Sequence, residues 1–430
     1  MLPNLEFPPV SSRTTLRLAL ALALGALALV GCGSGGGHRE PRLSATQLLV
    51  WSSVPQRGPL REIGADVLAA ERLALAHDGG RVGRYRVKLV ALDASTPGLG
   101  RSDPAQISQN ARRAAKSPRT VAYLGELATG TSAISIPLTN EAGILQVSPL
   151  DTAMAYTTRS LAVAGSPERY YPKLRDEGRT FARVVPSDRT QVDALLTAMR
   201  SSGVHRLAIL TDEDPSGRAL ATNLRAKAHA AGIAVVLREE IDEHATRHED
   251  LTAHIREADA DATLDATGPR VGAARLWREL HTADPLLQLY APANLADPSF
   301  VAALGPAADV AHVTQPAYDA VADDLAAQRF IRAFRSAYGH APAAQARYGY
   351  EAMRGVLAAI RHAEADADGP VTRRAITRAY FATVVQGGVL GPYAIEPDGD
   401  TTLDRWGAFR VVDGRLRFAG GVGDRSAIEG

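Results

Sequence analysis

Short apolar runs, separated by segments of helical periodicity, make up most of this chain. Two of the runs, 121–124 and 144–147, enclose a helix-like segment, and the second stops at Ser148-Pro149, where proline cannot continue a central sheet ladder. This order predicts a strand, a helix and a second strand. The turns at 125–131 and 148–152 are expected side by side at the carboxyl edge of a parallel sheet, where such sheets bind ligands.

The same alternation extends over the rest of the chain. Further runs typical of strands lie at 48–51, 86–92, 180–185, 206–210, 233–237, 262–266, 287–291 and 310–314. Later segments are predicted to form helices at 323–338, 343–363 and 371–381 and a hairpin at 406–412 and 416–419. Residues 159–178 lack periodicity and are expected to form a long surface loop. The pattern predicts an α/β fold of mainly parallel sheets flanked by helices.

The first turn of the central unit carries residues suited to binding. The opening N–H groups of a helix lack intrahelical partners and sit at its positive end, so they suit a carboxylate or another anion. Gly130 lets a ligand approach the backbone, and the hydroxyls of Thr129, Thr131 and Ser132 offer further hydrogen bonds. The alternative is that Thr129 or Thr131 only caps the helix.

The N-terminal residues are typical of a targeting segment. Arg13 and Arg17 precede the apolar run 18–30, which is too short for a membrane-spanning helix and suits a signal peptide. Cys32, the only cysteine, ends a Leu-Val-Gly-Cys sequence that resembles the bacterial lipobox. Residues 1–31 are therefore predicted to be a lipoprotein signal peptide, Cys32 the lipidated residue, and 32–46 a flexible tether. A single cysteine excludes a disulfide within the chain.

Charge and length narrow the classes of partner and fold. The chain has 48 basic and 47 acidic residues, and removing 1–31 takes away Arg13, Arg17 and Glu6, which leaves 46 of each. A net charge of zero argues against nucleic acid as a partner. The remaining length, about 400 residues, exceeds one ordinary core and predicts two lobes.

Several motifs together resemble those of one family. Residues 125–130 (GELATG), 140–144 (NEAGI) and 148–152 (SPLDT) resemble the GP-x-S-S/T-G, NEAGI and SP-x-x-T elements of the Leu/Ile/Val-binding receptors, the periplasmic proteins that serve branched-chain amino-acid transporters. Further on, the elements FRTAPSD, VTSPYD and GVLGP of that family are resembled by residues 180–188, 310–318 and 388–392. The resemblance runs from about residue 47 to about residue 418 in family order.

This resemblance implies a type I periplasmic-binding-protein fold. Two lobes, each a mainly parallel sheet flanked by helices, would be joined by three crossover strands at the last three elements. The first lobe would comprise 47–184 and 317–388, and the second 185–316 and 389–430. A ligand would bind in the cleft between the lobes and favour the closed state.

The ligand contacts that the resemblance implies are only partly matched. Thr129, Gly130, Thr131 and Thr152 match the first-lobe turns in kind. In the second lobe, the corresponding stretches 265–270 and 290–294 lack the aromatic residue and the acid that hold a ligand ammonium group in amino-acid binders. Either Glu126 or Asp151 supplies the missing negative charge, or Arg270 indicates a ligand with a second anion. The set of expected ligand contacts is Glu126, Thr129, Gly130, Thr131, Ser148, Asp151, Thr152, Arg270, Asn294 and Tyr318.

The alternative for Glu126 is that its charge only stabilises the N-terminus of the following helix. The alternative for Arg270 is that its side chain points to solvent.

Other chemistry finds little support in the sequence. His244, His248 and His254 have spacing suited to metal ligands, but their polar surroundings favour a solvated surface over a metal site. The acids at 212–214 follow a strand and suit helix capping. No nucleophile elbow, phosphate loop or zincin motif is present, so neither an enzyme nor a cofactor is predicted.

The sequence thus predicts a monomeric receptor outside the cytoplasm, lipid-anchored at Cys32, that captures a small polar ligand such as an amino acid and delivers it to an ABC permease. A sensor on the same scaffold, feeding a signalling partner, is the alternative. An extracellular enzyme is less favoured than either.

Overall fold

The computed structural model describes residue 43 and residues 46–97, 102–242, 248–268, 272–316 and 325–422. The predicted signal peptide, Cys32 and most of the predicted tether lie outside the described residues, as do His244, Arg270 and Tyr318. Within the described part, no helix is both long and apolar enough to cross a membrane.

The first sheet gathers six strands in the order β2-β3-β1-β4-β5-β6. Every pairing in it is parallel except that of β2 with β3. The central strand β1 is buried along nearly its whole length, as expected for a strand covered on both faces. The strands are β1 (Gln47–Val54), β2 (Arg81–Val82), β3 (Tyr85–Asp93), β4 (Thr120–Leu124), β5 (Leu145–Ser148) and β6 (Phe181–Arg183).

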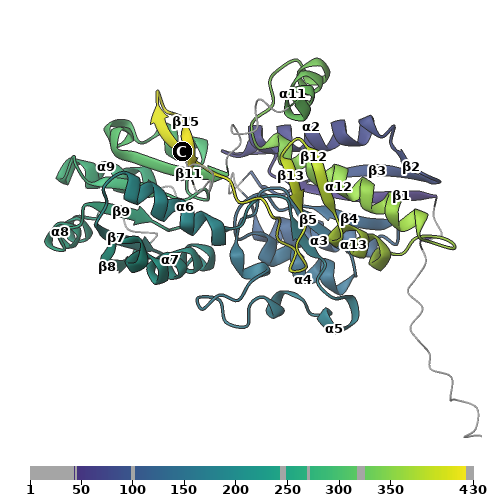
Figure 1. The fold of residues 1–430 in the computed structure, drawn as a ribbon, viewed down its shortest axis with the longest axis horizontal. Coiled ribbons are helices and arrows are strands. Elements are labelled where there is room, and N and C mark those ends of the chain that lie inside the picture. Colours follow the sequence, from purple (N-terminus) through teal and green to yellow (C-terminus); the bar gives the residue numbers. More distant parts are fainter. Residues whose placement is uncertain are drawn as a thin grey trace, which may run out of the picture. The chain divides into compact units, whose positions relative to one another are not determined.

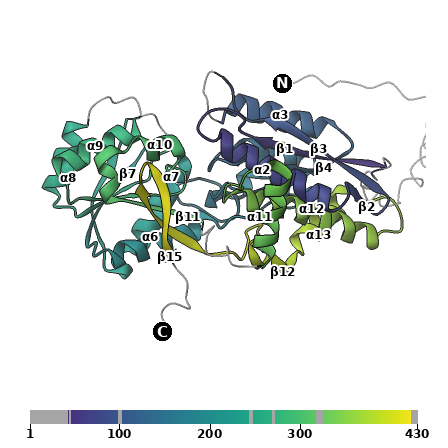
Figure 2. The ribbon, with the colours of Figure 1, turned by 90° about the horizontal axis from the view of Figure 1, so that it is seen from above.

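Helices from two distant parts of the chain pack on this sheet. The helices α2 (Arg61–His77), α3 (Pro104–Lys116) and α4 (Ser132–Glu141) lie between its strands in sequence. From the C-terminal third, α12 (Ala346–Ala365) packs against α2, and both α11 (Leu325–Tyr338) and α13 (Arg373–Phe381) join the same group (Figures 1 and 2). The chain therefore returns to the first sheet after building the second.

The second sheet has the order β15-β14-β11-β10-β9-β7-β8. Its strands from β7 to β11 pair in parallel, and β14 and β15 add antiparallel at one edge. In Figure 1 the yellow strand β15 lies with this sheet, although β12 and β13 just before it in sequence lie with the first. The strands are β7 (Arg206–Thr211), β8 (Ala234–Glu240), β9 (Ala262–Asp265), β10 (Gln288–Ala291), β11 (Ala311–Pro316), β14 (Trp406–Val412) and β15 (Arg415–Val422).

The helices of this half alternate with its parallel strands. They are α6 (Asp188–Ser201), α7 (Pro215–Ala228), α8 (Glu249–Glu257), α9 (Ala273–Ala283) and α10 (Pro298–Ala302). The predicted α/β class is confirmed, because strands and helices occupy the segments that their periodicity indicated. The assignment of residues to two lobes at the stated bounds stays a prediction.

Residues 159–178 differ from the long surface loop that their polarity predicted. They contain the short helices η2 (Glu168–Tyr170) and α5 (Leu174–Glu177), and Tyr170 and Tyr171 are buried. The rings of Tyr170 and Phe181 both contact Tyr156, the last residue of η1 (Met154–Tyr156), edge to face. Aromatic packing thus holds the segment beside β6 of the first sheet, which a periodicity search cannot detect.

The GVLGP element at 388–392 also differs from expectation. It forms the turn between β12 (Val384–Gly388) and β13 (Gly391–Ala394), which pair with each other as a two-stranded sheet. The carboxylate of Glu351 on α12 accepts the N–H of Val389 at 2.6 Å, so this hairpin is attached to the helices of the first lobe. The passage to the second sheet follows later, at residues 395–405.

Candidate functional site

The turn between β4 and α4 is closed by the carboxylate of Asp151. Asp151 Oδ1 accepts the N–H of Gly130 at 2.9 Å, and Oδ2 accepts the N–H of Ser132 at 2.8 Å. Gly130 has a φ of +91°, which suits glycine. The helix N-terminus that the sequence offered to a ligand anion therefore already holds an anion of the protein itself.

Asp151 is fully buried and accepts further hydrogen bonds. The N–H of Ala153 donates to Oδ1 at 3.1 Å, and the hydroxyl of Tyr156 donates to Oδ2 at 3.3 Å. Burial raises the pKa of the Asp151 carboxyl, while the donors at Ser132 and Gly130 act in the opposite direction. Because every described partner donates, the arrangement suits an ionised carboxylate.

The threonines of the two turns meet each other. Thr129 Oγ1 lies 2.9 Å from Thr152 Oγ1, which brings together two residues predicted as ligand contacts. The hydroxyl of Thr131 instead donates to the carbonyl of Ala128 in its own turn. Ser148 Oγ donates to the carbonyl of Glu126 at 2.7 Å and accepts the N–H of Asp151 at 2.8 Å. The hydroxyls of Ser148 and Thr131 therefore stabilise the backbone of the turns. The hydroxyls of Thr129 and Thr152 join one turn to the other.

Glu126 points into the first lobe. Its Oε2 accepts the hydroxyl of Ser53 on β1 at 3.0 Å, and its Oε1 accepts the hydroxyl of Tyr123 on β4 at 2.7 Å. Burial raises the pKa of this carboxyl to about 8, so it is protonated at neutral pH. The side chain of Glu126 is thus turned to the core, where its described partners are residues of β1 and β4.

The start of α7 faces the turn at Gly130. A Cβ added at Gly130 would lie 2.9 Å from Ser216 Oγ and 3.7 Å from Asp214 Oδ1. Asp214 caps α7, since its Oδ2 accepts the N–H of Gly217 at 2.9 Å, as the sequence predicted for this acidic turn. Asp212 accepts the N–H groups of Asp214 and Gly268, each at 2.9 Å. Backbone donors here are again taken by carboxylates of the chain.

Asp188, the first residue of α6, is a member of this group that sequence reasoning missed. Its side chain is 3 % exposed, and burial raises its pKa to about 7. The Thr152 hydroxyl and Arg183 act to lower that pKa, whereas Asp151 and Asp214 raise it. The signal lies in the Pro-Ser-Asp sequence at 186–188, which the family resemblance assigns to a crossover.

Of the remaining predicted contacts, Asn294 lies among the described residues. Asn294 follows β10, is half-buried, and its Nδ2 donates to the carbonyl of Thr267 at 3.4 Å, so it joins two loops of the second sheet. Arg270 and Tyr318 are outside the described residues.

The histidine motif forms no metal site among the residues that the structure describes. His254 Nδ1 lies 3.0 Å from Glu239, and His248 Nδ1 lies 3.0 Å from Glu279. His248 is buried, which corrects the expectation of a fully solvated segment. The two side chains have different partners on different elements and do not converge.

Comparison with known proteins now identifies the family. A family model described as periplasmic binding protein matches residues 52–415. This chain belongs to that family. Members are solute-binding receptors and not enzymes, and their place is outside the cytoplasm. No curated protein sequence matches the chain.

Solved structures of periplasmic binding proteins share its fold. The leucine-binding protein LivK of Thermotoga maritima has 21 % identity and a TM-score of 0.70, with 88 % of this chain and 99 % of that chain covered. LivJ of Streptococcus pneumoniae in complex with isoleucine has 15 % identity, a TM-score of 0.67 and coverages of 87 % and 99 %. A solute-binding protein of an ABC transporter from R. palustris in complex with benzoate has 19 % identity, a TM-score of 0.65 and coverages of 88 % and 98 %.

Proposed function

We propose that this binding protein is anchored outside the cytoplasm through Cys32 and delivers a small polar solute to an ABC permease. The solute would bind where the turns at Gly130 and Ser216 face each other, beside the hydroxyl pair of Thr129 and Thr152. This meeting of turns from the carboxyl ends of β4, β5 and β7 is the observation that supports the proposal. Closure of the two predicted lobes on the solute would then produce the closed form that the permease recognises.

The backbone N–H donors near these turns argue against a negatively charged solute. Free N–H groups at the start of a helix are a ready-made site for a solute carboxylate. Here Asp151 takes those of Gly130 and Ser132, and Asp214 takes that of Gly217. A solute carboxylate would have to displace one of these acids.

The side-chain charges argue in the same direction. Asp151, Asp188 and Asp214 influence one another electrostatically, and Asp212 adjoins Asp214. Arg183, the buried cation beside them, forms an ion pair with Asp400. Among the described residues of the proposed site, negative charge therefore exceeds positive charge, and a solute with an ammonium group would offset it.

Calorimetry on the purified mature chain tests this proposal. The panel should contain protonated alkyl amines and diamines, zwitterionic amino acids, neutral amides and benzoate. We expect binding of compounds that carry an ammonium group and none of benzoate. Asp214→Asn should weaken that binding about tenfold, the size of one lost charge interaction near a protein surface. Asp284→Asn, at an exposed helix end, serves as the matched control.

Binding of benzoate alone, or equal effects of the two substitutions, would refute the charge assignment. Absence of binding by every compound of the panel would count against the site itself.

The substitution Glu126→Gln is expected to leave amine affinity at about pH 7 within twofold of the wild type. The carboxyl is neutral there and contacts Ser53 and Tyr123, so the amide replaces it at nearly constant charge and shape. At about pH 9 the variant should be the more stable protein. Because the folded pKa of about 8 exceeds the ordinary 4.5, the stabilisation present below pH 4.5 is lost as the pH rises through 8.

Titration calorimetry at about pH 7 and urea unfolding at about pH 5 and pH 9 measure the two effects. A tenfold loss of affinity in Glu126→Gln would place the carboxyl at the solute after all.

A further inference from the structure

The loop at residues 148–157, termed the ligand loop because it carries Asp151 and Thr152, contacts three other parts of the molecule. Its position is held by the strand β6, by the start of α6 and by the apolar cluster of the second sheet. The segment 395–405, termed the C-terminal connection, links β13 to β14. It reaches the ligand loop through Arg179, whose Nη1 donates to the carbonyls of Thr157 and Asp398 at 2.8 and 3.3 Å, and through a buried side chain of β6.

That side chain is Arg183, which is fully buried. Its Nη1 donates to the carbonyl of Asp151 at 3.0 Å, and its Nη2 donates to the carbonyl of Ala153 at 2.9 Å and to Thr157 Oγ1 at 3.1 Å. A planar guanidinium with several fixed donors can hold three points of one loop at once. Arg183 therefore sets the path of the ligand loop from its middle to its end.

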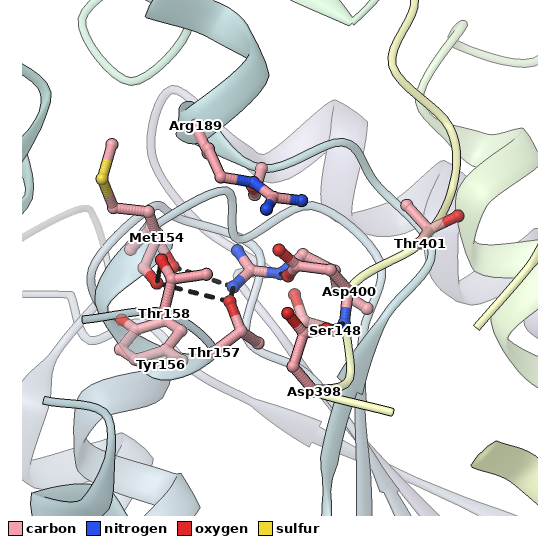
Figure 3. A network of polar contacts seen from close by, with 12 residues as sticks. Ser148, Met154, Tyr156, Thr157, Thr158, Arg189, Asp398, Asp400 and Thr401 are labelled. Carbon is pink, nitrogen blue, oxygen red and sulfur yellow. Dashed lines mark hydrogen bonds and ion pairs between the residues drawn. The ribbon is translucent and has the colours of Figure 1, made fainter. Parts of the chain in front are cut away.

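The fourth partner of Arg183 lies on the C-terminal connection. Its Nε is 2.9 Å from Asp400 Oδ1, and both side chains are almost completely buried. Figure 3 shows Met154, Thr157 and Thr158 of the loop region on one side of this network and Asp398, Asp400 and Thr401 on the other. A buried ion pair that loses one member leaves an uncompensated charge, so a change in either side chain affects both segments.

The backbone adds to this attachment. The N–H of Arg183 donates to the carbonyl of Gly399 at 2.9 Å. Gly399 has a φ of +96°, and a Cβ there would lie 2.2 Å from the carbonyl oxygen of Phe181. Only glycine allows the connection to lie this close to β6.

The opposite side of the ligand loop is tied to the second half of the chain. The N–H of Asp188, at the start of α6, donates to the carbonyl of Thr152 at 2.8 Å. Met154 packs in the apolar cluster that contains Leu195 and Leu220, and Asn223 Nδ2 lies 3.1 Å from its sulfur. The loop thus contacts the connection at 184–188 directly and is joined to the connection at 395–405 through Arg183 and Arg179.

We propose that Arg183 and Asp400 are positioning residues that link movement of the C-terminal connection to the ligand loop. The chain of contacts runs from Asp400 through Arg183 to the backbone of Asp151, and from the Asp151 carboxylate to the first turn of α4. Closing or opening of the connections then shifts Thr129 and Thr152 together. The role of the loop in binding rests on the proposed function, but the contact chain does not require a ligand.

Hydrogen–deuterium exchange of the mature chain without ligand tests the link. Asp400→Asn keeps the shape of the side chain and removes its charge. We expect about tenfold faster exchange in peptides that cover 128–136 and 148–160, which contain the amides of Gly130, Ser132 and Ala153. Exchange in β1 and β9 should stay unchanged. Glu396→Gln is the matched control, because Glu396 lies on the same connection but in an exposed pair with Arg189, 3.6 Å apart.

A second variant tests the same link from the other end. Thr157→Val removes one acceptor of Arg183 and leaves the ion pair intact, so it keeps the test available if Asp400→Asn does not fold. Because coupling is reciprocal, it should accelerate exchange in the connection peptide that covers 395–405. Faster exchange confined to the substituted segment would overturn the proposal, because it would show that the two segments are not linked. An equal rise of the exchange rate in β1 and β9 would also overturn it, because it would show only a global loss of stability. Amine affinity plays no part in these readouts, so failure of the proposed function would be seen separately.

Discussion

Replacing Asp151 with alanine is expected to lower the free energy of unfolding by about 3–5 kcal/mol and to abolish amine binding. The buried carboxylate accepts the N–H groups of Gly130, Ser132 and Ala153, which would be left without a partner. Its loss also removes the acceptor at the N-terminus of α4. The turn that carries Thr129 would then no longer be fixed beside Thr152.

Urea unfolding and calorimetry with the amine selected from the panel measure the two effects. Asp297→Ala is the matched control, because Asp297 also caps a helix but at a half-exposed position, where Oδ1 accepts the N–H groups of Ser299 and Phe300. That substitution should cost about 1 kcal/mol and leave binding unchanged. Equal losses of stability in both variants would show that the Asp151 carboxylate is no more than an ordinary helix cap.

Affinity for a protonated amine is expected to rise about tenfold per pH unit up to about pH 7 and to level off above it. Asp188 carries this dependence, because its carboxyl has a pKa of about 7 and must lose its proton to pair with a cation. The charged and polar groups that act on it are the Thr152 hydroxyl, Arg183, Asp151 and Asp214. Calorimetry between about pH 5 and pH 8.5, with an amine that stays protonated throughout, measures the slope.

The same carboxyl makes the stability of the fold fall as the pH rises, which is opposite to its effect on amine affinity. Its folded pKa of about 7 lies above the ordinary 3.8, so the unfolded chain loses the proton first. The stabilisation present below about pH 3.8 is therefore lost as the pH rises through 7. Asp188→Asn should flatten both profiles, with lower amine affinity above pH 7 and higher stability there. If the affinity of Asp188→Asn kept the pH dependence of the wild type, the titrating group would be another residue.

The family and the order of elements followed from the sequence because they depend on local patterns. Apolar runs of strand length alternate with helical periodicity, and the central runs that form β1 and β4 are buried in the structure. The motif at 148–152 placed Thr152 at a strand end, and the structure brings its hydroxyl to that of Thr129. Such features are set within a few residues of each other along the chain.

The chemistry of the site depended on contacts between distant residues. Glu126 and Asp151 were equivalent candidates in sequence, but burial beside Ser53 and Tyr123 neutralises the first, while donors 21 and 19 residues away keep the second an acceptor. The 159–178 segment differs from its prediction for the same reason, since Tyr170 packs on the ring of Tyr156 and the hydroxyl of Tyr171 donates to the Tyr156 carbonyl.

The sequence by itself determined the fold class, the family and the positions of the turns that carry Thr129 and Thr152, because these follow from periodicity and short motifs. Only the tertiary structure decided that an acid of the chain fills the helix N-terminus, that Asp188 joins the acids there, and that Arg183 meets Asp400. The physical reason is that the charge and hydrogen-bonding state of a buried group are set by the partners and the solvent exclusion that folding gives it.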